Sequence, residues 1–371
     1  MKYYMIAGEA SGDLHGSNLI RELHKLDKNA DTRCWGGDKM NAAGATLVKH
    51  YRDLAFMGFT EVIKNLPTIF RNLAFCKTDI LNYKPDLLIL IDYPGFNLRI
   101  AKWAKQQGIK VVFYISPQVW AWKENRVKGI KKNVDKMLVI LPFEKEFYKK
   151  WDLEVEYVGH PLVEVVEAFQ QEHKNTSNPT SERAIIALLP GSRKQEILKK
   201  LPVMLDVAGR FPQYKFIVAK APGLPDEFYQ NLLSAYKNVG SVANQTYELL
   251  NQSQAALVTS GTATLETALF GVPEIICYQG GNISYQIAKR LIKIKYIGLV
   301  NLIMDKEVVK ELIQDELTVD NISSELDRLL YDETRKAQLS MDYAALKELL
   351  GRGGNASLNA AKSILRFLTK Q

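Results

Sequence analysis

The sequence predicts an α/β protein of two lobes, each holding a parallel sheet with helices on both faces. Short apolar runs, such as residues 87–91 and 184–189, alternate along the chain with segments whose apolar residues recur at helical spacing. Continuous apolar runs of this kind are typical of parallel strands buried on both faces. The length also fits, because 371 residues with 47% hydrophobic and 24% charged side chains suit two soluble domains.

The same patterns place the elements in order. In the first lobe we expect strands at residues 3–7, 32–35, 87–91, 110–115, 136–141 and 154–158, and helices at residues 17–26, 98–107 and from 142 onward. Residues 170–183 are polar and predict a linker, after which we expect strands at residues 184–189, 214–219, 255–259 and 274–278. The amphipathic residues 355–368 predict a last helix that crosses back to the first lobe. We therefore expect one lobe at residues 1–169, joined by residues 355–371, and another at residues 184–345.

Composition limits the class of protein. Three widely spaced cysteines argue against a disulfide framework and fit a reducing compartment, and five scattered histidines form no metal-ligand pattern. The chain begins with a strand rather than a signal peptide, and no apolar run reaches the ~20 residues that cross a bilayer. We expect a cytoplasmic protein that can touch a membrane from that side. Its net charge of +8 suits an anionic partner, either a nucleotide, a nucleic acid or an anionic lipid.

Two strand–turn–helix joints in the second lobe predict an anion site. Ser192, as a helix cap, and Arg193 follow one strand, while Gly261 and Thr262 follow another and open a helix with Glu266 one turn further on. Free backbone N–H groups, the helix dipole and the guanidinium favour phosphate. The Glu266 carboxylate suits sugar hydroxyls instead. The pair predicts a nucleotide site; the alternative for the second segment is an ordinary strand–loop–helix connection with a solvated Glu266.

The segment after the first strand carries a second candidate site. Glu9, Ser11, Gly12 and Asp13 lie there, between glycines whose spacing does not match a dinucleotide fingerprint, and no Walker lysine follows. This argues against a dehydrogenase. The side chains are expected at the carboxyl edge of the sheet, where ligands bind, although Ser11 or Asp13 could simply cap a tight turn.

Asp92 is the best catalytic candidate, because it directly follows the buried strand at residues 87–91. Partial burial would raise its pKa and make it a better general base, although it could instead bond only to the N–H groups of the turn. Asn97 is expected to cap the next helix. Ser116 and Trp120 belong to a turn whose tryptophans could form a sugar-stacking wall. His160 ends the last strand of this lobe and could either bind substrate or shape the hinge.

Taken together, the motifs resemble the lipid A disaccharide synthase family nearly from end to end and in the expected order. The matching segments are Gly-Glu-Ala-Ser-Gly-Asp at 8–13, Ile-Asp-x-Pro-x-Phe-Asn at 91–97, Ser-Pro-x-Val-Trp-Ala-Trp at 116–122, Leu-Pro-Phe-Glu at 141–144, Gly-His-Pro at 159–161, Leu-Pro-Gly-Ser-Arg at 189–193 and Thr-Ser-Gly-Thr-Ala-Thr-Leu-Glu at 259–266. The resemblance implies a two-lobed glycosyltransferase of the GT-B type that acts in the biosynthesis of lipid A, the anchor of lipopolysaccharide.

The resemblance also implies the reaction and its residues. The donor would be UDP-2,3-diacylglucosamine and the acceptor 2,3-diacylglucosamine 1-phosphate, lipid X, with inversion giving a β-1,6-linked disaccharide 1-phosphate and UDP. Asp92 would be the essential carboxylate, and Arg193, Glu266, Asn301 and Gln314 would belong to the donor site. The chain departs from many relatives at residues 93–95, which read Tyr-Pro-Gly where Ala-Pro-Asp is common, and at residues 299–301, which read Leu-Val-Asn where Leu-Pro-Asn is usual.

No Asp-x-Asp pair of the kind used by metal-dependent sugar transferases stands out, so we expect neither a metal nor another cofactor. The family implies a peripheral place on the anionic cytoplasmic face of the inner membrane of a Gram-negative bacterium, no nucleic-acid partner, and possibly a homodimer. The alternatives are another GT-B enzyme that uses a UDP-sugar, of the muramyl-lipid transferase or epimerase type, and a non-catalytic sensor of nucleotide or anionic lipid.

Residues 54–75 are expected to form a membrane-facing patch that receives acyl chains. Their apolar side chains are too many for one half-buried helix stripe, and Lys64 and Arg71 are placed to meet anionic headgroups while Pro67 interrupts the run. The alternatives are buried core and a dimer contact. The patch residues are Phe56, Phe59, Val62, Ile63, Leu66, Ile69 and Phe70.

Overall fold

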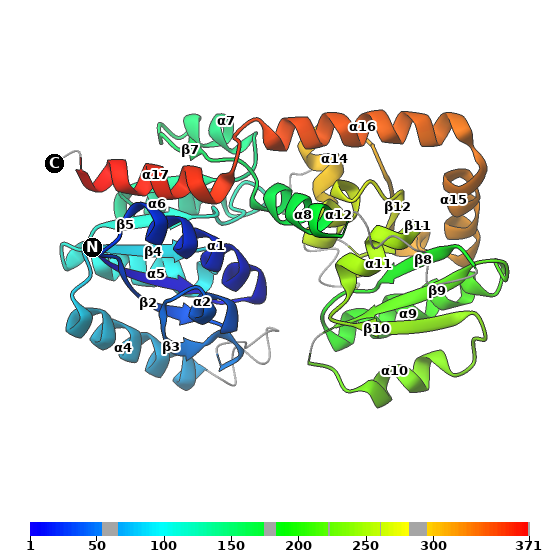
Figure 1. Cartoon of the computed structure of the whole chain (residues 1–371), viewed down its shortest axis with the longest axis horizontal. Helices are drawn as coiled ribbons and strands as arrows, with labels where there is room; N and C mark the ends of the chain where they lie inside the picture. Colours follow the sequence, from blue (N-terminus) through cyan, green and yellow to red (C-terminus); the bar gives the residue numbers. More distant parts are fainter. Residues whose placement is uncertain (54–65, 174–182, 222, 260, 282–294, 370–371) are drawn as a thin grey trace. The chain divides into compact units, whose positions relative to one another are not determined.

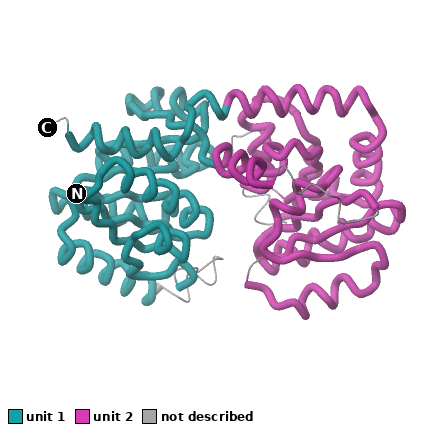
Figure 2. The backbone as a smooth tube through the Cα atoms, in the orientation of Figure 1, with its two compact units in different colours: residues 1–161, 350–371 teal, residues 162–349 magenta. Residues whose placement is uncertain are grey.

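The computed structural model describes residues 1–53, 66–173, 183–221, 223–259, 261–281 and 295–369. The chain divides into two compact units, residues 1–161 with 350–371, and residues 162–349 (Figure 2). The expected boundary at residue 169 falls inside helix α8 (Pro161–Glu172), nearly all of which belongs to the second unit. The expected linker thus begins as helix, and residues 174–182 of it lie outside the described ranges.

The first unit contains a parallel sheet of seven strands in the order β3-β2-β1-β4-β5-β6-β7 (Figure 1). The strands are β1 (Lys2–Ala7), β2 (Asp31–Gly36), β3 (Thr46–His50), β4 (Leu87–Ile91), β5 (Val111–Tyr114), β6 (Lys136–Val139) and β7 (Glu156–Tyr157). The order reverses between β1 and β4, which pair so that Ala7 lies opposite Ile91. Such a reversal opens a crevice at the carboxyl ends of the two strands, and ligands of doubly wound folds bind there.

Helices cover both faces of this sheet. They are α1 (Ala10–Leu26), α2 (Asp38–Ala42), α4 (Leu66–Tyr83), α5 (Pro94–Gln106), α6 (Val127–Asn133), α7 (Glu144–Lys149) and α17 (Ala356–Thr369), with short 3₁₀ turns at Tyr51–Asp53 and Glu124–Arg126. Side chains alternate along each strand, so Tyr4 and Ile6 join one core with α4, α5 and α6, whereas Ile91 faces Gly16 of α1. The helix expected at residues 17–26 begins at Ala10, and the one expected at 98–107 begins at Pro94.

The second unit repeats this plan with six parallel strands in the order β10-β9-β8-β11-β12-β13. The strands are β8 (Ile185–Leu189), β9 (Lys215–Lys220), β10 (Val239–Ala243), β11 (Ser253–Val258), β12 (Glu274–Tyr278) and β13 (Lys310–Ile313). The helices are α9 (Lys194–Ala208), α10 (Asp226–Leu233), α11 (Thr246–Gln252), α12 (Thr262–Leu269), α14 (Leu299–Met304), α15 (Val319–Tyr331) and α16 (Glu333–Gly351), with a 3₁₀ turn at Gln314–Glu316. The reversal here lies between β8 and β11.

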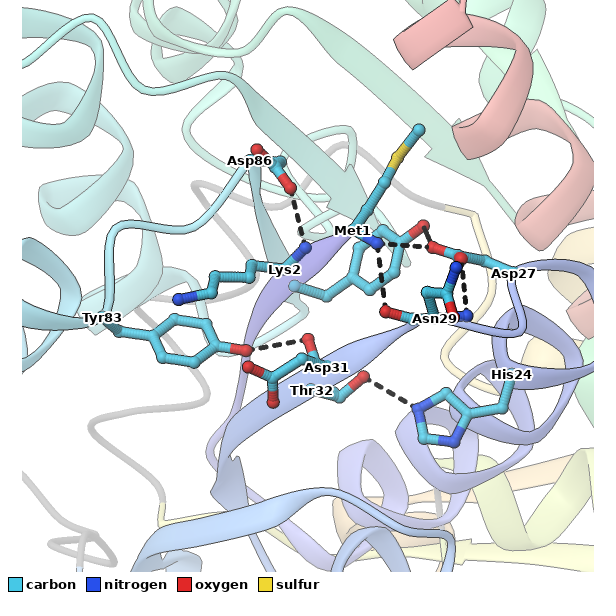
Figure 3. Close-up of polar contacts among 10 residues, drawn as sticks. Met1, Lys2, His24, Asp27, Asn29, Asp31, Thr32, Tyr83 and Asp86 are labelled. Carbon is cyan, nitrogen blue, oxygen red and sulfur yellow. Dashed lines mark hydrogen bonds and ion pairs between the residues drawn. The ribbon is translucent and has the colours of Figure 1, made fainter.

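The amino ends of the first unit's central strands are held by short polar contacts (Figure 3). Asp27 accepts hydrogen bonds from the N-terminal ammonium at 2.9 Å and from the Tyr3 hydroxyl at 3.0 Å. The backbone N–H of Lys2 donates to Asp86 at 2.8 Å, directly before β4. These contacts satisfy polar groups at the edge opposite the reversal crevice, so we assign them to stability rather than to ligand binding.

The last helix, α17, packs on α1 in the first unit. The connection between α16 and α17 approaches the end of β7 so closely that a Cβ on Gly353 would lie 2.5 Å from the backbone nitrogen of Gly159. Asn359 of α17 also donates to the carbonyl of Val158 at 3.1 Å. This contact brings two segments about 200 residues apart in sequence into one unit.

We predict that Gly353→Ala destabilises the protein, because the added methyl group meets backbone atoms that cannot rotate away. Overpacking of this kind costs roughly 1–3 kcal/mol. Gly351→Ala is the matched control, since nothing lies within 4 Å of its Cβ position. Urea unfolding of both variants tests the prediction, and equal midpoints for the two would contradict it.

Candidate active site

Two turns meet at the reversal point of the second sheet. Leu189, the last residue of β8, lies opposite Val258, the last residue of β11. Each strand then passes through a glycine with positive φ, Gly191 at +115° and Gly261 at +113°, before a helix begins. Only glycine adopts these backbone angles without strain. The starts of α9 and α12 are therefore brought to one edge of the sheet.

A cavity of about 620 Å³ opens between these turns, large enough for a nucleotide-sized ligand. Its lining includes the donor-site residues expected from the two joints, namely Ser192, Arg193, Gly261, Thr262 and Glu266. Arg193 occupies the N-cap position of α9, where Ser192 was expected, and no side chain caps that helix. The guanidinium is 58% exposed and lies 3.1 Å from Glu196, so it is free to turn toward an anion.

Glu266 lies on the wall of this cavity, where burial raises the pKa of its carboxyl group. The hydroxyl of Tyr247 donates to its Oε1 at 2.8 Å and opposes part of that effect. The Tyr247 ring is fixed in turn by Phe169 and Phe270, at 5.5 and 5.2 Å between ring centroids. One carboxylate oxygen is thus oriented by the protein, leaving the other as an acceptor for a ligand hydroxyl.

Asn301 and Gln314 do not line the cavity. Asn301 is fully buried, and its Oδ1 accepts from the backbone of Val308 and Val309 while its Nδ2 donates to Glu311 at 2.9 Å. Asn301 therefore stabilises the connection between α14 and β13, and its buried side chain has no exposed surface that could bind a sugar-nucleotide donor. Gln314 accepts from the backbone N–H of Gly280 at 3.0 Å, at the carboxyl edge of β12 and β13.

Asp92 lies at the reversal point of the first sheet, one residue beyond β4. Both Asp92 and Tyr93 adopt left-handed backbone angles, with φ of +44° and +49°, in the turn between β4 and α5. Burial raises the pKa of Asp92 to about 7, and the neighbouring Glu9 carboxylate adds to the rise. A carboxyl group poised near neutral pH suits a general base.

The surroundings of Asp92 are built by its neighbours. Gly8 leaves room for the Tyr93 ring, because a Cβ there would lie 2.2 Å from the ring. Asn97 is not the cap expected from the sequence, since α5 begins at Pro94. Its buried amide instead donates to the carbonyls of Ile6, Ile91 and Asp92, the last at 2.8 Å. Asn97 therefore ties β1 to β4 behind the carboxylate.

Of the other residues expected on the acceptor side, some are exposed on the surface and some are buried and stabilise the fold. Glu9 and Ser11 are exposed at the start of α1. Gly12 is buried beside Ala7. Asp13 is only 3% exposed and accepts from the backbone N–H groups of Gly37, Lys39 and Met40 at 2.8–3.1 Å. Asp13 holds the turn before α2, which leaves it no face for a substrate.

Buried side-chain contacts hold the turn after β5 in place. Ser116 is buried and its hydroxyl lies 2.5 Å from that of Tyr148. Trp120 is also buried and packs edge-on against Phe143, whereas Trp122 is 45% exposed.

His160 is 4% exposed. Burial, and to a smaller extent the nearby His15, lowers the pKa of its imidazole to about 3, so His160 is neutral at physiological pH.

The expected membrane patch falls mostly outside the described ranges, which omit Phe56, Phe59, Val62, Ile63 and the side chain of Leu66. Two members are placed on α4. Phe70 is 60% exposed, and Ile69 packs against the core of the first unit.

Within the described ranges, no helix is both long and apolar enough to span a bilayer. No set of three or more acidic, histidine or cysteine side chains in those ranges is grouped to hold a metal.

Sequence reasoning missed several cavity residues. Glu196, Lys220, Thr246 and Tyr278 line the cavity, and Tyr247 orients Glu266. Glu196 could have been found, because it lies three residues after Arg193, in the first turn of the helix that Arg193 precedes. The others come from strand ends and helix starts far away in sequence, with no motif to mark them.

A model of the family described as lipid-A-disaccharide synthetase matches residues 3–364 of the chain. Proteins named lipid-A-disaccharide synthase from Geobacter metallireducens and Coxiella burnetii are 40% and 37% identical to it, and the matches cover 99% and 97% of this chain and 97% and 96% of theirs. The chain belongs to the lipid-A-disaccharide synthase family. The resemblance drawn from the ordered motifs is confirmed.

Solved structures relate this family member to a broader fold. The UDP-GlcNAc 2-epimerase of Neisseria meningitidis, solved with UDP-GlcNAc, aligns with a TM-score of 0.67 at 15% identity and covers 100% of both chains. The calicheamicin glycosyltransferase CalG4 aligns with a TM-score of 0.63 at 16% identity, over 99% of this chain and 98% of that one. The expected architecture, two parallel-sheet lobes of the GT-B type, is confirmed.

We predict that Asp92→Asn stabilises the protein at alkaline pH. A carboxyl group with a raised pKa binds its proton more tightly when folded, so its cost to stability is absent below about pH 4 and complete above about pH 7. The free energy of unfolding of the variant should exceed that of wild type by on the order of 1–3 kcal/mol at pH 8, and by much less at pH 5. Urea unfolding at both pH values, with the exposed Asp53→Asn as control, tests this. A difference that does not change with pH would contradict it.

Proposed function

We propose that the protein transfers 2,3-diacylglucosamine from UDP to the 6-hydroxyl of 2,3-diacylglucosamine 1-phosphate, with inversion and without a metal. The products are a β-1,6-linked disaccharide 1-phosphate and UDP. The observation that carries the proposal is the place of four family motifs, at residues 8–13, 91–97, 189–193 and 259–266, which follow the strands at the reversal points of the two sheets. One point holds a cavity with Arg193 and Glu266, and the other holds Asp92. The named relatives are 40% and 37% identical to this chain over nearly its whole length.

The donor half of the proposal rests on charge. Breaking the bond between C1 and the phosphate oxygen leaves extra negative charge on UDP, which must be stabilised as it forms. The starts of α9 and α12 and the Arg193 guanidinium provide positive ends and hydrogen-bond donors at one cavity. The partly oriented Glu266 carboxylate is then an acceptor for ribose hydroxyls. These groups can replace the metal ion that other sugar transferases use.

The acceptor half rests on Asp92. In an inverting transfer, the acceptor oxygen bonds to C1 as the bond to UDP breaks, and the hydroxyl proton goes to a base. With a pKa of about 7, Asp92 is largely ionised just above neutrality and still basic enough to take the proton. Asn97 and the left-handed turn hold it in place and are assigned a positioning role. Glu9 and Ser11 are exposed at the same edge and are proposed to bind the acceptor.

Both proposed substrates carry acyl chains, so the enzyme must take them from a membrane. We place it on the cytoplasmic face of the inner membrane, with residues 54–75 as the contact. The exposed Phe70 on α4 and the net charge of +8 support this assignment. The partners in this scheme are the two lipid substrates and an anionic bilayer surface.

A product assay tests the proposal directly. Purified protein is incubated with both lipid substrates, with and without EDTA, and the products are analysed by mass spectrometry. We expect disaccharide 1-phosphate and UDP in equal amounts and at equal rates under both conditions. No disaccharide would refute the activity, and loss of the rate in EDTA with recovery in magnesium would refute the metal-independent mechanism.

We predict that Asp92→Asn lowers turnover by about 10²–10⁴-fold, the usual contribution of a positioned general base. Because asparagine tolerates left-handed backbone angles, the turn should survive, and UDP affinity should be unchanged. In wild type, the rate should rise with pH through about 7, as the carboxylate forms. Turnover near that of wild type in a folded variant would exclude the role of base.

We predict that Arg193→Ala and Glu266→Ala each weaken UDP binding, by about ten-fold to hundred-fold for a hydrogen bond to a charged group. Lys199→Ala is a control, since this exposed cation lies on the same helix but not on the cavity wall. Titration calorimetry with UDP measures all three variants. Unchanged affinity in both cavity variants would remove the donor assignment.

A further inference from the structure

Lys200 is an unusual residue of α9, because its side chain is only 2% exposed. Within the described ranges it forms no ion pair with a carboxylate, although Glu196 lies near enough to influence it. Burial lowers the pKa of Lys200, and Glu196 opposes part of that effect. A buried ammonium group is costly unless something compensates its charge, so its place in the fold requires an explanation.

Lys200 donates a hydrogen bond to the hydroxyl oxygen of Thr259. An ammonium group has no lone pair, so the threonine oxygen must accept, and its own proton must point elsewhere. Thr259 is 6% exposed and forms part of the cavity wall. Its methyl group lies 3.5 Å from where a Cβ on Gly191 would stand, so the Thr259 side chain lies beside the turn after β8. The hydroxyl proton of Thr259 is therefore available to donate, and it has no acceptor among the described residues.

The spacing along α9 places Lys200 behind the cavity. Glu196 and Lys200 are four residues apart on α9 and therefore share one helix face, and Arg193 is the N-cap residue of the same helix. Arg193 and Glu196 line the cavity, whereas Lys200 reaches its wall only through Thr259. The cavity therefore has a positive charge beneath its surface, joined to it by one hydroxyl group.

We propose that Lys200 polarises the Thr259 hydroxyl into a fixed donor for the phosphate oxygens of a nucleoside diphosphate. Thr259 then binds the ligand, and Lys200 is a positioning residue that acts through it. The inference rests on the proposed donor site and adds two residues to it. The negative charge of a phosphate near the hydroxyl would also offset the positive charge of the buried Lys200 ammonium. Burying this charge is unfavourable in the ligand-free protein, and ligand binding would relieve that cost.

The test compares UDP with uridine, which lacks the phosphates. The variants are Thr259→Val, Lys200→Met, the double variant, and Thr259→Ser, which keeps the hydroxyl. Calorimetry gives the UDP affinity, and ligand-observed NMR gives the uridine affinity. Thr259→Val alone leaves the buried ammonium unpartnered and could impair folding, whereas the double variant removes both partners together and should fold.

We expect Thr259→Val to weaken UDP binding by about ten-fold to hundred-fold, with a smaller loss in Lys200→Met. The double variant should match Thr259→Val, Thr259→Ser should recover most of the affinity, and uridine binding should stay constant throughout. Wild-type UDP affinity in the double variant, equal losses for UDP and uridine, or additive losses in the double variant would each overturn the inference alone. Failure of the wild-type protein to bind UDP would instead overturn the proposed function, and this inference with it.

Discussion

Parallel pairing of strands buried on both faces is the constraint on which the rest of this molecule depends. Such strands run in one direction, so the chain must leave every strand at the same edge of the sheet. Where the strand order reverses, two neighbouring exits diverge and leave a crevice. Gly8 and Asp92 flank this point in the first unit, and Gly191 and Gly261 flank it in the second. Residues more than 60 positions apart in sequence become neighbours through this geometry alone.

Burial then sets the chemistry of the side chains at these points. Asp92 and Glu266 both have raised pKa values because burial disfavours their charged forms, and the pKa of Lys200 is lowered for the same reason. In each case a different partner opposes the pKa shift that burial causes. Asp92 has a backbone N–H, Glu266 has the Tyr247 hydroxyl, and Lys200 has Glu196 nearby. Ionisable groups in these states suit proton transfer and anion binding better than fully solvated ones would.

Framework residues near the sites carry polar side chains as well, which is why polarity alone does not identify a functional residue. Asp13 bonds to backbone N–H groups, and Asn301 bonds to backbone groups and to Glu311, and both hold turns in place. Asn97 also bonds to backbone, yet its partners are the ends of β1 and β4, so it influences the position of Asp92. The backbone partners of each side chain separate a structural role from a positioning role.

The sequence by itself determined the fold class, the positions of most strands along the chain and the family. The strand at Leu87–Ile91 was predicted at its observed bounds, because a continuous apolar run can be buried on both faces whatever its neighbours are. The joints that carry Arg193 and Glu266 were also visible, since glycine turns and helix starts are local features. Helix α1 was placed seven residues late, because its first turns contain glycine and serine, whose low helix propensity is outweighed by packing against the sheet.

Only the tertiary structure decided which polar residues are accessible. Asp13, Asn301 and Glu266 look alike as acidic or amide side chains beside a turn, but two are enclosed by backbone partners and one lies on the cavity wall. The pairing of Lys200 with Thr259, 59 residues apart, has no local signal either. Local sequence specifies backbone preference and periodicity, whereas burial and partners depend on which distant strands become neighbours. For this protein the sequence determined where the sites lie along the chain, and the packing within each unit decided which side chains in them can meet a ligand.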